Sequence, residues 1–462
     1  MLSTLFGSIQ SKSPRRPVYS LVLWIGLTFV LVAASTYFLS QTRPAVDYFT
    51  HREEEPEPPA NRTNPLLTKE GIDQFVLDHA YPRLGEKTNF TGLHQLCNST
   101  KWQTHVYFTC SHNAGGLMNV RNMVLNCVRY AIAAGASGLV LPQIEARDQA
   151  DLTHLRTEEY RNMGFLFDET WFKEVMKENC GQMELFDTIE DIPYSGYAMM
   201  PDVLNIQAIM EQPRGSKHGA LRNKKPWEFR SRFDNLIKSQ KRRPTEKSPV
   251  IVRLDDRTLF SFPPTFDPPS VLNSFGFILD FRLDLSALAN FIVDRVHQTL
   301  NASAGNDSYV GLHLRSEPDA GKYWATWDQL AEATISTAVG NEIKLIYVAS
   351  GDTDGVAKLT KKAVDSGIQV LDKWSILSGD EKEYLAPFRF DQQAIVDYLA
   401  LMRSDRFVGS GQSSFSSHLL MRRELLANMT LAEEGKHLEP GSVPRDQLAG
   451  PGRLGYWDMD WP

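Results

Sequence analysis

Cysteine is scarce in this sequence of 462 residues, and its 49 Lys and Arg residues are fewer than its 56 Asp and Glu residues. It has four cysteines, and no two of them are spaced as C-x-x-C, which excludes a zinc or thioredoxin-like redox site of that type. The formal net charge is −7, so nucleic acid is not expected as a partner. No stretch is repeated at a fixed spacing, which excludes a solenoid. We expect no resident metal and no cofactor.

Long hydrophobic runs are scarce too, and only one is long enough to cross a membrane. Residues 21–39 carry no charged side chain and number about 19, which matches the thickness of a hydrocarbon core. Basic residues precede this run and acidic residues follow it, so the positive-inside rule places residues 1–20 in the cytosol. Val32-Ala33-Ala34 also resembles a signal-peptidase site, so a cleaved signal peptide is the alternative. We expect a single-pass type II protein of the Golgi or endoplasmic reticulum membrane with a lumenal body.

Three further features fit a lumenal body. Residues 40–66 are rich in Pro and Glu, which predicts an extended stem. The even number of cysteines allows two disulfides in any of three pairings. We favour Cys97–Cys110, which flank one predicted strand, and Cys127–Cys180, which would tie a helix to a loop. The acceptor motif for N-linked glycans occurs at Asn61, Asn89, Asn98, Asn301, Asn306 and Asn428.

The rest of the chain alternates between strand and helix patterns. A strand at 106–110, a glycine loop, a helix at about 118–134 and a strand at 138–142 form a unit typical of a parallel sheet. The second half repeats the alternation, with strands predicted at 309–314, 343–349, 369–371 and 406–409. A Pro-rich seam at 263–269 separates the halves. We therefore predict an α/β fold with two Rossmann-like domains, 67–268 and 269–434, facing each other across a cleft, and an irregular tail at 435–462.

One stretch places charge at the end of a predicted buried strand. Val310, Leu312 and Leu314 form an apolar run that ends at Arg315, and Glu317 follows two residues later. Ligands of open α/β sheets bind at the carboxyl ends of strands. The planar guanidinium of Arg315 suits a phosphate or a carboxylate. The alternative is a structural Arg–Glu ion pair beside a histidine buried in the core.

Three motifs in order resemble the GDP-fucose protein O-fucosyltransferases and their plant O-fucosyltransferase relatives. The first reads Gly-Gly-Leu-Met-Asn-Val-Arg at 115–121, with Leu-Val-Leu-Pro at 139–142 behind it. The second is His-Leu-Arg-x-Glu-x-Asp at 313–319, and the third runs from 396 to Ser-Ser-Phe at 413–415. The resemblance covers roughly residues 100 to 430. It implies the GT-B fold and inverting, metal-independent transfer of fucose from GDP-fucose to a hydroxyl of a protein or glycan.

The resemblance also implies roles for individual residues. Arg315 would hold the β-phosphate, Ser413 and Ser414 would donate hydrogen bonds to the diphosphate, and Phe415 would pack near the guanine. Asn119 would reach the donor from the first domain. Glu317, near Arg315, is our candidate for the general base. The predicted nucleotide-sugar site comprises Gly115, Gly116, Asn119, His313, Arg315, Ser413, Ser414 and Phe415.

Two features leave other functions open. Met118 stands where many relatives have Asn, and Asn119 lies one residue further on, so a sugar- or protein-binding module without turnover is one alternative. Asp352-Thr353-Asp354 follows a predicted strand, and a D-x-D motif there would suit a metal-dependent glycosyltransferase. Turnover of GDP-fucose with and without a chelator separates these readings.

Overall fold

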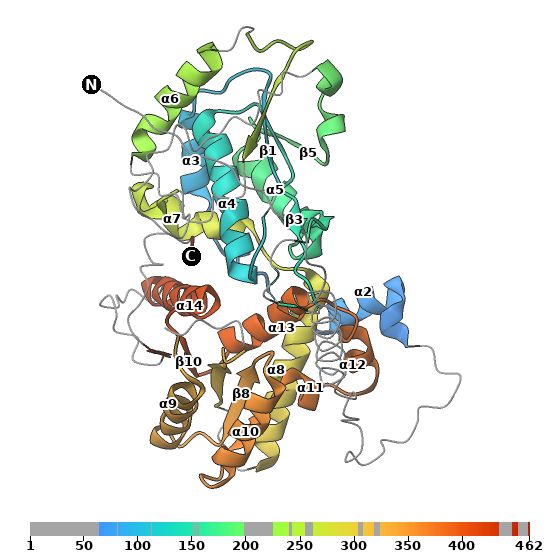
Figure 1. Cartoon of the computed structure of the whole chain (residues 1–462), viewed down its shortest axis with the longest axis vertical. Helices are drawn as coiled ribbons and strands as arrows, with labels where there is room; N and C mark the ends of the chain where they lie inside the picture. Colours follow the sequence, from blue (N-terminus) through green and yellow to red (C-terminus); the bar gives the residue numbers. More distant parts are fainter. Residues whose placement is uncertain are drawn as a thin grey trace, which may run out of the picture. The chain divides into compact units, whose positions relative to one another are not determined.

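A computed structural model describes residues 64–462, except 81, 112, 150, 153, 155–156, 198–224, 240–242, 255–261, 304–307, 318–323, 434–445 and 451–460 (Figure 1). Within the described part, no helix is both long and apolar enough to cross a membrane. The predicted span at 21–39, the stem up to residue 63, and the glycosylation sites Asn61 and Asn306 lie outside the described residues.

The amino-terminal sheet has four parallel strands in the order β5-β2-β1-β6. They span Glu184–Phe186, Gly138–Val140, Val106–Cys110 and Val250–Leu254. Helix α4 (Leu117–Ala134) connects β1 to β2, and nearly all of its side chains are buried. It ends at Gly135, whose φ of 65° is left-handed and whose Cα lies against the carbonyl of Lys101, so a side chain there would clash. The glycine therefore allows the chain to turn directly into β2.

The carboxyl-terminal sheet has five parallel strands in the order β11-β10-β7-β8-β9. In this order they span Asp446–Ala449, Arg406–Ser410, Val310–His313, Leu345–Ala349 and Gln369–Leu371. Helices α9 (Trp327–Gly340) and α10 (Thr353–Val364) connect the inner strands, and α13 (Phe390–Met402) and α14 (Ser414–Glu433) flank β10 in the chain. Figure 1 shows α9 and α10 beside β8.

The other elements are short or connect the two sheets. The α-helices are α2 (Lys69–Asp78), α3 (Thr91–Ser99), α5 (Glu169–Asn179), α6 (Pro226–Ser239), α7 (Pro269–Phe275), α8 (Leu283–Ser303), α11 (Lys373–Ile376) and α12 (Gly379–Leu385). Strands β3 (Ile144–Glu145) and β4 (Tyr160–Arg161) form an antiparallel pair. The 3-10 helices are η1 (Pro65–Leu67), η2 (Met163–Phe165), η3 (Ile189–Asp191), η4 (Ser195–Tyr197), η6 (Pro264–Phe266) and η7 (Gly276–Ile278).

Two parallel sheets with connecting helices confirm the predicted α/β class. The domain boundary at 268/269 stays a prediction. The tail was predicted to be irregular, and at β11 this is wrong, because residues 446–449 pair in parallel with β10. Asp446 fixes this strand, since its carboxylate accepts hydrogen bonds from the backbone of Phe407 and the guanidinium of Arg423. Polar contacts, which leave no apolar pattern in the sequence, hold the strand in place.

The end of the described chain packs into the amino-terminal half. The side chain of Trp461 is fully buried, and its ring lies 4.5 Å from that of Phe275 and 6.0 Å from that of Phe262, centroid to centroid. Its indole N–H donates to Asn126 on α4 at 2.9 Å. Buried Arg121, also on α4, donates to the carbonyl of Trp461 at 2.7 Å and lies 2.6 Å from His418 on α14. Trp461 thus completes the core of the amino-terminal half, although it follows the carboxyl-terminal half in the sequence.

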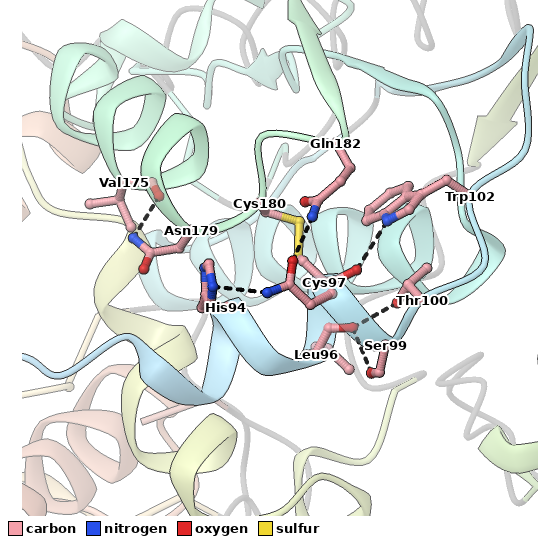
Figure 2. The surroundings of a disulfide bond; sticks show 11 residues. His94, Leu96, Cys97, Ser99, Thr100, Trp102, Val175, Asn179, Cys180 and Gln182 are labelled. Carbon is pink, nitrogen blue, oxygen red and sulfur yellow. Dashed lines mark hydrogen bonds between the residues drawn. A yellow bond between two sulfur atoms is a disulfide. The ribbon is translucent and has the colours of Figure 1, made fainter.

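The favoured disulfide pairing is wrong. The bonds are Cys97–Cys180 and Cys110–Cys127, with Cα–Cα distances of 5.3 and 6.2 Å. Cys127 lies on the buried face of α4, which packs on β1 and so brings it to Cys110 at the end of that strand. Figure 2 shows the other bond, where the end of α3 meets the residue that caps α5. Contacts between elements, and not distance along the chain, decide the pairing.

The predicted glycosylation sites within the described residues differ in their surroundings. Asn89 and Asn301 are exposed, and Asn428 is half-buried. Asn98 is exposed beside the Cys97–Cys180 bond, where its Nδ2 lies 2.8 Å from His94 and its Oδ1 accepts from Gln182 at 2.7 Å. Attachment of glycans at these positions stays a prediction.

Candidate active site

A cavity of about 340 Å³ opens at the carboxyl ends of β7 and β8. Its walls also include the starts of α4, α13 and α14, so both halves of the protein contribute to it. The fold brings together Gly116, Asn119, His313, Arg315, Glu317, Ser413, Ser414 and Phe415 from the predicted site. Gly115 lies one residue before the wall and does not line the cavity. The strand-end position predicted for the site is thus where the cavity lies.

The side chains of Glu317 and Trp324 lie against the guanidinium of Arg315. Its Nη1 lies 2.6 Å from Oε2 of Glu317, and its guanidinium carbon lies 5.3 Å from the centre of the Trp324 ring. The other carboxylate oxygen of Glu317 accepts the backbone N–H of Gly351 at 2.8 Å. A guanidinium fixed in this way has little freedom to lose when an anion binds it. Charge and orientation are therefore prepared in advance at the end of β7.

His313 is a neutral group beside this cation. Burial, followed by the charge of Arg315, lowers the pKa of His313 to about 3. Its Nδ1 lies 2.7 Å from Oγ of Ser416, and its ring centre lies 4.4 Å from that of Phe415. At neutral pH the positive charge of this wall is that of Arg315, and His313 offers hydrogen-bonding nitrogens and a ring face.

Two helices begin at the cavity. Gly116 is the residue before the first turn of α4 and has no side chain to cap it, so backbone N–H groups of that turn are not capped by a side chain. Buried Ser413 precedes α14, which begins at Ser414. The amino ends of helices carry partial positive charge and bind anions. Together with Arg315, these two helix starts suit a diphosphate.

Asn119 contributes a buried acceptor to the wall of the cavity. Its Oδ1 atom is buried and has no hydrogen-bond partner, although the residue lines the cavity. Buried polar atoms without a partner are rare and costly in native proteins. A ligand hydroxyl at this place would satisfy the oxygen. Met118, the residue that departs from the family pattern, also lines the wall and is buried.

A buried polar network forms another part of the wall. Lys373 lies 2.6 Å from Oδ2 of Asp397, and the hydroxyl of Tyr347 donates to Oδ1 of the same carboxylate at 2.8 Å. Burial raises the pKa of Asp397, and the charge of Lys373 opposes that rise. Asp397 belongs to the third motif, whereas no signal in the sequence marked Lys373. The two meet because α11 and α13 both pack on α8.

The D-x-D motif has a structural role in this fold. One carboxylate oxygen of Asp352 accepts the backbone N–H of Gly355 at 2.8 Å and so caps α10, and the other accepts from Ser316 at 2.6 Å. Asp354 is exposed. Among the residues that the structure describes, no group of three or more His, Cys, Asp or Glu side chains is placed to hold a metal. The contacts of Asp352 account for this aspartate without a metal.

The fold and the cavity define an α/β protein whose strand-end cavity combines the guanidinium of Arg315, two helix starts and the unpartnered amide oxygen of Asn119. The sequence assigns the particular family: the chain belongs to the GDP-fucose protein O-fucosyltransferases, whose pattern it matches over residues 107–426. The resemblance stated from the three motifs is thereby confirmed, and the protein is a glycosyltransferase of the GDP-fucose type.

Three fucosyltransferases are among the solved structures to which the chain shows some similarity. POFUT1 in complex with GDP-fucose is 14% identical, with 77% of this chain and 100% of that chain covered and a TM-score of 0.42. A variant of FUT1 from Arabidopsis thaliana in complex with GDP is 14% identical, with 76% of each chain covered and a TM-score of 0.35. NodZ from Bradyrhizobium is 11% identical, with 69% and 92% covered and a TM-score of 0.34. No curated protein matches the sequence.

Proposed function

We propose that this protein is a GT-B glycosyltransferase that transfers fucose from GDP-fucose to a hydroxyl of a protein or glycan, with inversion and without a metal. The observation that carries the proposal is the fixed guanidinium of Arg315 beside the starts of α4 and α14. As the bond between fucose and phosphate breaks, negative charge grows on the leaving diphosphate. Donors that already point at this charge stabilise the transition state more than the ground state.

The remaining wall residues fit the parts of the donor. Ser413 and Ser414 would donate hydrogen bonds to the diphosphate, and Phe415 offers a ring face to the guanine. Asn119, which lies in the amino-terminal half, would accept a hydrogen bond from a hydroxyl of the donor at its unsatisfied Oδ1. His313, neutral and in contact with Phe415, would support that ring.

The role of Glu317 as a general base stays a prediction. Both of its oxygens already accept hydrogen bonds, from Arg315 and from the backbone of Gly351. A base needs an oxygen free to take the proton of the acceptor. These contacts favour a second role in which Glu317 holds Arg315 in the orientation that binds the β-phosphate.

We also propose a lumenal location in the Golgi or endoplasmic reticulum, behind a single membrane anchor at 21–39. Charge asymmetry around that run supports it. All four cysteines are paired in disulfides, which is the state favoured in an oxidising compartment. Endoglycosidase treatment and carbonate extraction test the location, since a lumenal anchored protein loses mass in the first and stays with the membrane in the second.

A binding protein of the same fold without turnover is the second candidate, and buried Met118 at the cavity wall is the observation that favours it. One experiment separates the two. Release of GDP from GDP-fucose is measured for the wild type with and without EDTA, and GDP binding is measured by calorimetry. Turnover that EDTA leaves intact supports the enzyme, whereas GDP binding without turnover supports the binding protein.

Arg315→Lys tests the group on which the proposal rests. Lysine keeps the charge and loses the planar pair of donors, so we expect the rate of GDP release to fall by about 10²-fold or more. Wild type and variant are compared at matched distance below their melting temperatures. Equal rates would remove Arg315 from the site and leave the ion pair with Glu317 as a structural feature.

A further inference from the structure

Two opposite charges face the cavity without partners. Asp391 is 6% exposed and lines the cavity, and Arg147 lines it too. Within the part of the chain that the structure describes, the carboxylate of Asp391 makes no hydrogen bond or ion pair, and neither does the guanidinium of Arg147, whose Nε is buried. Neither residue belongs to a motif found in the sequence.

The two side chains come from different halves of the protein. Arg147 follows β3 in the amino-terminal half, and Asp391 is the second residue of α13 in the carboxyl-terminal half. Arg389 joins the two segments, because its Nη2 lies 2.7 Å from Glu159 and its Nη1 donates to the carbonyl of Arg147 at 3.4 Å. Gln392, on the other side of Asp391, donates to the carbonyl of Phe165 at 3.0 Å. Contacts between the halves therefore fix the backbone around both charges.

Asp391 and Arg147 are near enough to affect each other electrostatically, but they form no ion pair. Burial raises the pKa of Asp391 to about 6, and the charges of Arg147 and Arg389 oppose that rise. A buried carboxylate without a direct hydrogen bond or ion pair is costly, and a direct ion pair with Arg147 would reduce that cost. The Arg147 guanidinium lies over the ring of Phe390 instead, 5.7 Å from its centre. An acceptor, a forked donor and an apolar ring thus border one space.

We propose that Arg147 and Asp391 together hold a sugar ring by neighbouring hydroxyls, with Asp391 accepting from one hydroxyl and Arg147 donating to the next. A hydroxyl both donates and accepts, so it can satisfy a carboxylate and a guanidinium at once. Phosphate would be repelled by Asp391 and a cation by Arg147. The pair therefore suits a neutral polyhydroxylated ring, with Phe390 as its apolar wall.

This inference rests on the proposed function, and it divides the cavity. Most side chains assigned to the nucleotide and its phosphates, namely Arg315, Ser413, Ser414 and Phe415, lie in the carboxyl-terminal half, and the start of α4 adds backbone groups from the other half. A clamp that also needs Arg147 of the other half suits the sugar portion of the substrates. The ring is either the fucosyl group of the donor or a sugar of the acceptor, since both present vicinal hydroxyls.

Calorimetry on the full chain distinguishes the sources. The probes are GDP and GDP-fucose, and the variants are Asp391→Asn and Arg147→Met, with Arg295→Met, an exposed arginine on α8, as control. If the clamp holds the donor sugar, both substitutions lower the affinity for GDP-fucose by about 10-fold or more, while the affinity for GDP stays that of the wild type. The control leaves both affinities unchanged.

If the clamp holds the acceptor, the loss appears in transfer. The probe is a printed array of mannosides, galactosides, glucosides and N-acetylglucosaminides, on which both variants raise the KM for the best wild-type acceptor by a similar factor. The inference is overturned if the variants match the wild type in both assays, or if their affinity for GDP falls as much as their affinity for GDP-fucose. A wild type that does not bind GDP-fucose overturns the proposed function, and this inference with it, before any variant is compared.

Discussion

Asp391→Asn should make the protein more stable at alkaline pH while it weakens the site. Burial raises the pKa of Asp391 from 3.8 to about 6 in the folded protein, whereas in the unfolded chain the carboxyl returns to its ordinary value. Between these two pH values the folded state binds the extra proton. The free energy of unfolding of the wild type therefore falls as pH rises through this window. The full loss is about 3 kcal/mol, since each unit of pKa corresponds to about 1.36 kcal/mol.

Asparagine has nearly the same shape and no charge, so the variant escapes this loss. We expect wild type and variant to differ least near pH 4 and most above pH 7, where the variant gains up to about 3 kcal/mol. The melting temperature at pH 8 should rise by a few degrees. Sites that bind ligands often reduce stability in this way.

The assay is thermal unfolding followed by circular dichroism at several pH values from 4 to 8. Asp365→Asn is the matched control, because Asp365 is exposed and the substitution changes the net charge by the same amount. A stability difference that is the same at pH 4 and pH 8 would refute the reasoning. So would a variant that loses stability relative to the wild type as the pH rises.

Three further outcomes follow from the packing and the electrostatics. Replacing both Cys97 and Cys180 by Ser should lower the free energy of unfolding by about 4–5 kcal/mol in a chain-entropy estimate, and replacing Cys110 and Cys127 by roughly 3 kcal/mol. The difference arises because the first bond closes a separation of 83 residues and the second a separation of 17. Denaturant unfolding compares the two variants, and equal losses would contradict the estimate. Trp461→Ala should cost about 3–5 kcal/mol because the indole is fully buried and bonded to Asn126, whereas an unchanged denaturation midpoint would show that the tail adds nothing. His313→Gln should leave the pH dependence of GDP binding unchanged from pH 5 to 8, because the pKa of His313 is lowered to about 3 and its ring stays neutral in that range. Calorimetry at several pH values measures this dependence. A step in GDP affinity near pH 6.5 that only the wild type shows would contradict the prediction.

Much of the fold could be predicted because its strands and helices are locally marked. The strand at 106–110 has the predicted bounds, since its five residues are all buried and apolar or β-branched to the end. Helix α4 begins at Leu117, one residue before the predicted start, because the backbone is still extended at Gly116. Arg315 could be singled out because it follows a strand with a clear apolar pattern, whereas Ser413 was named only because the third motif resembles that of the family.

What could not be predicted depends on contacts between distant elements. Arg147 and Asp391 are far apart in the chain and carry no motif, so only the packing of the two halves reveals that they border one cavity. The disulfide pairing was missed because it depends on which face of α4 turns toward β1. Strand β11 was missed because Asp-Gln-Leu-Ala has no apolar alternation, and its pairing depends on the bond from Asp446 to Arg423.

The place of Trp461 in the amino-terminal core sets an order of events during synthesis. A ribosome delivers the residues around Asn126 and Phe275 long before it delivers the indole that fills the space between them. Domains usually fold one after another as they emerge, and here the core of the first half stays incomplete until Trp461 has been synthesised. During that interval the nascent chain exposes the rings of Phe262 and Phe275, which are buried against the indole in the folded protein.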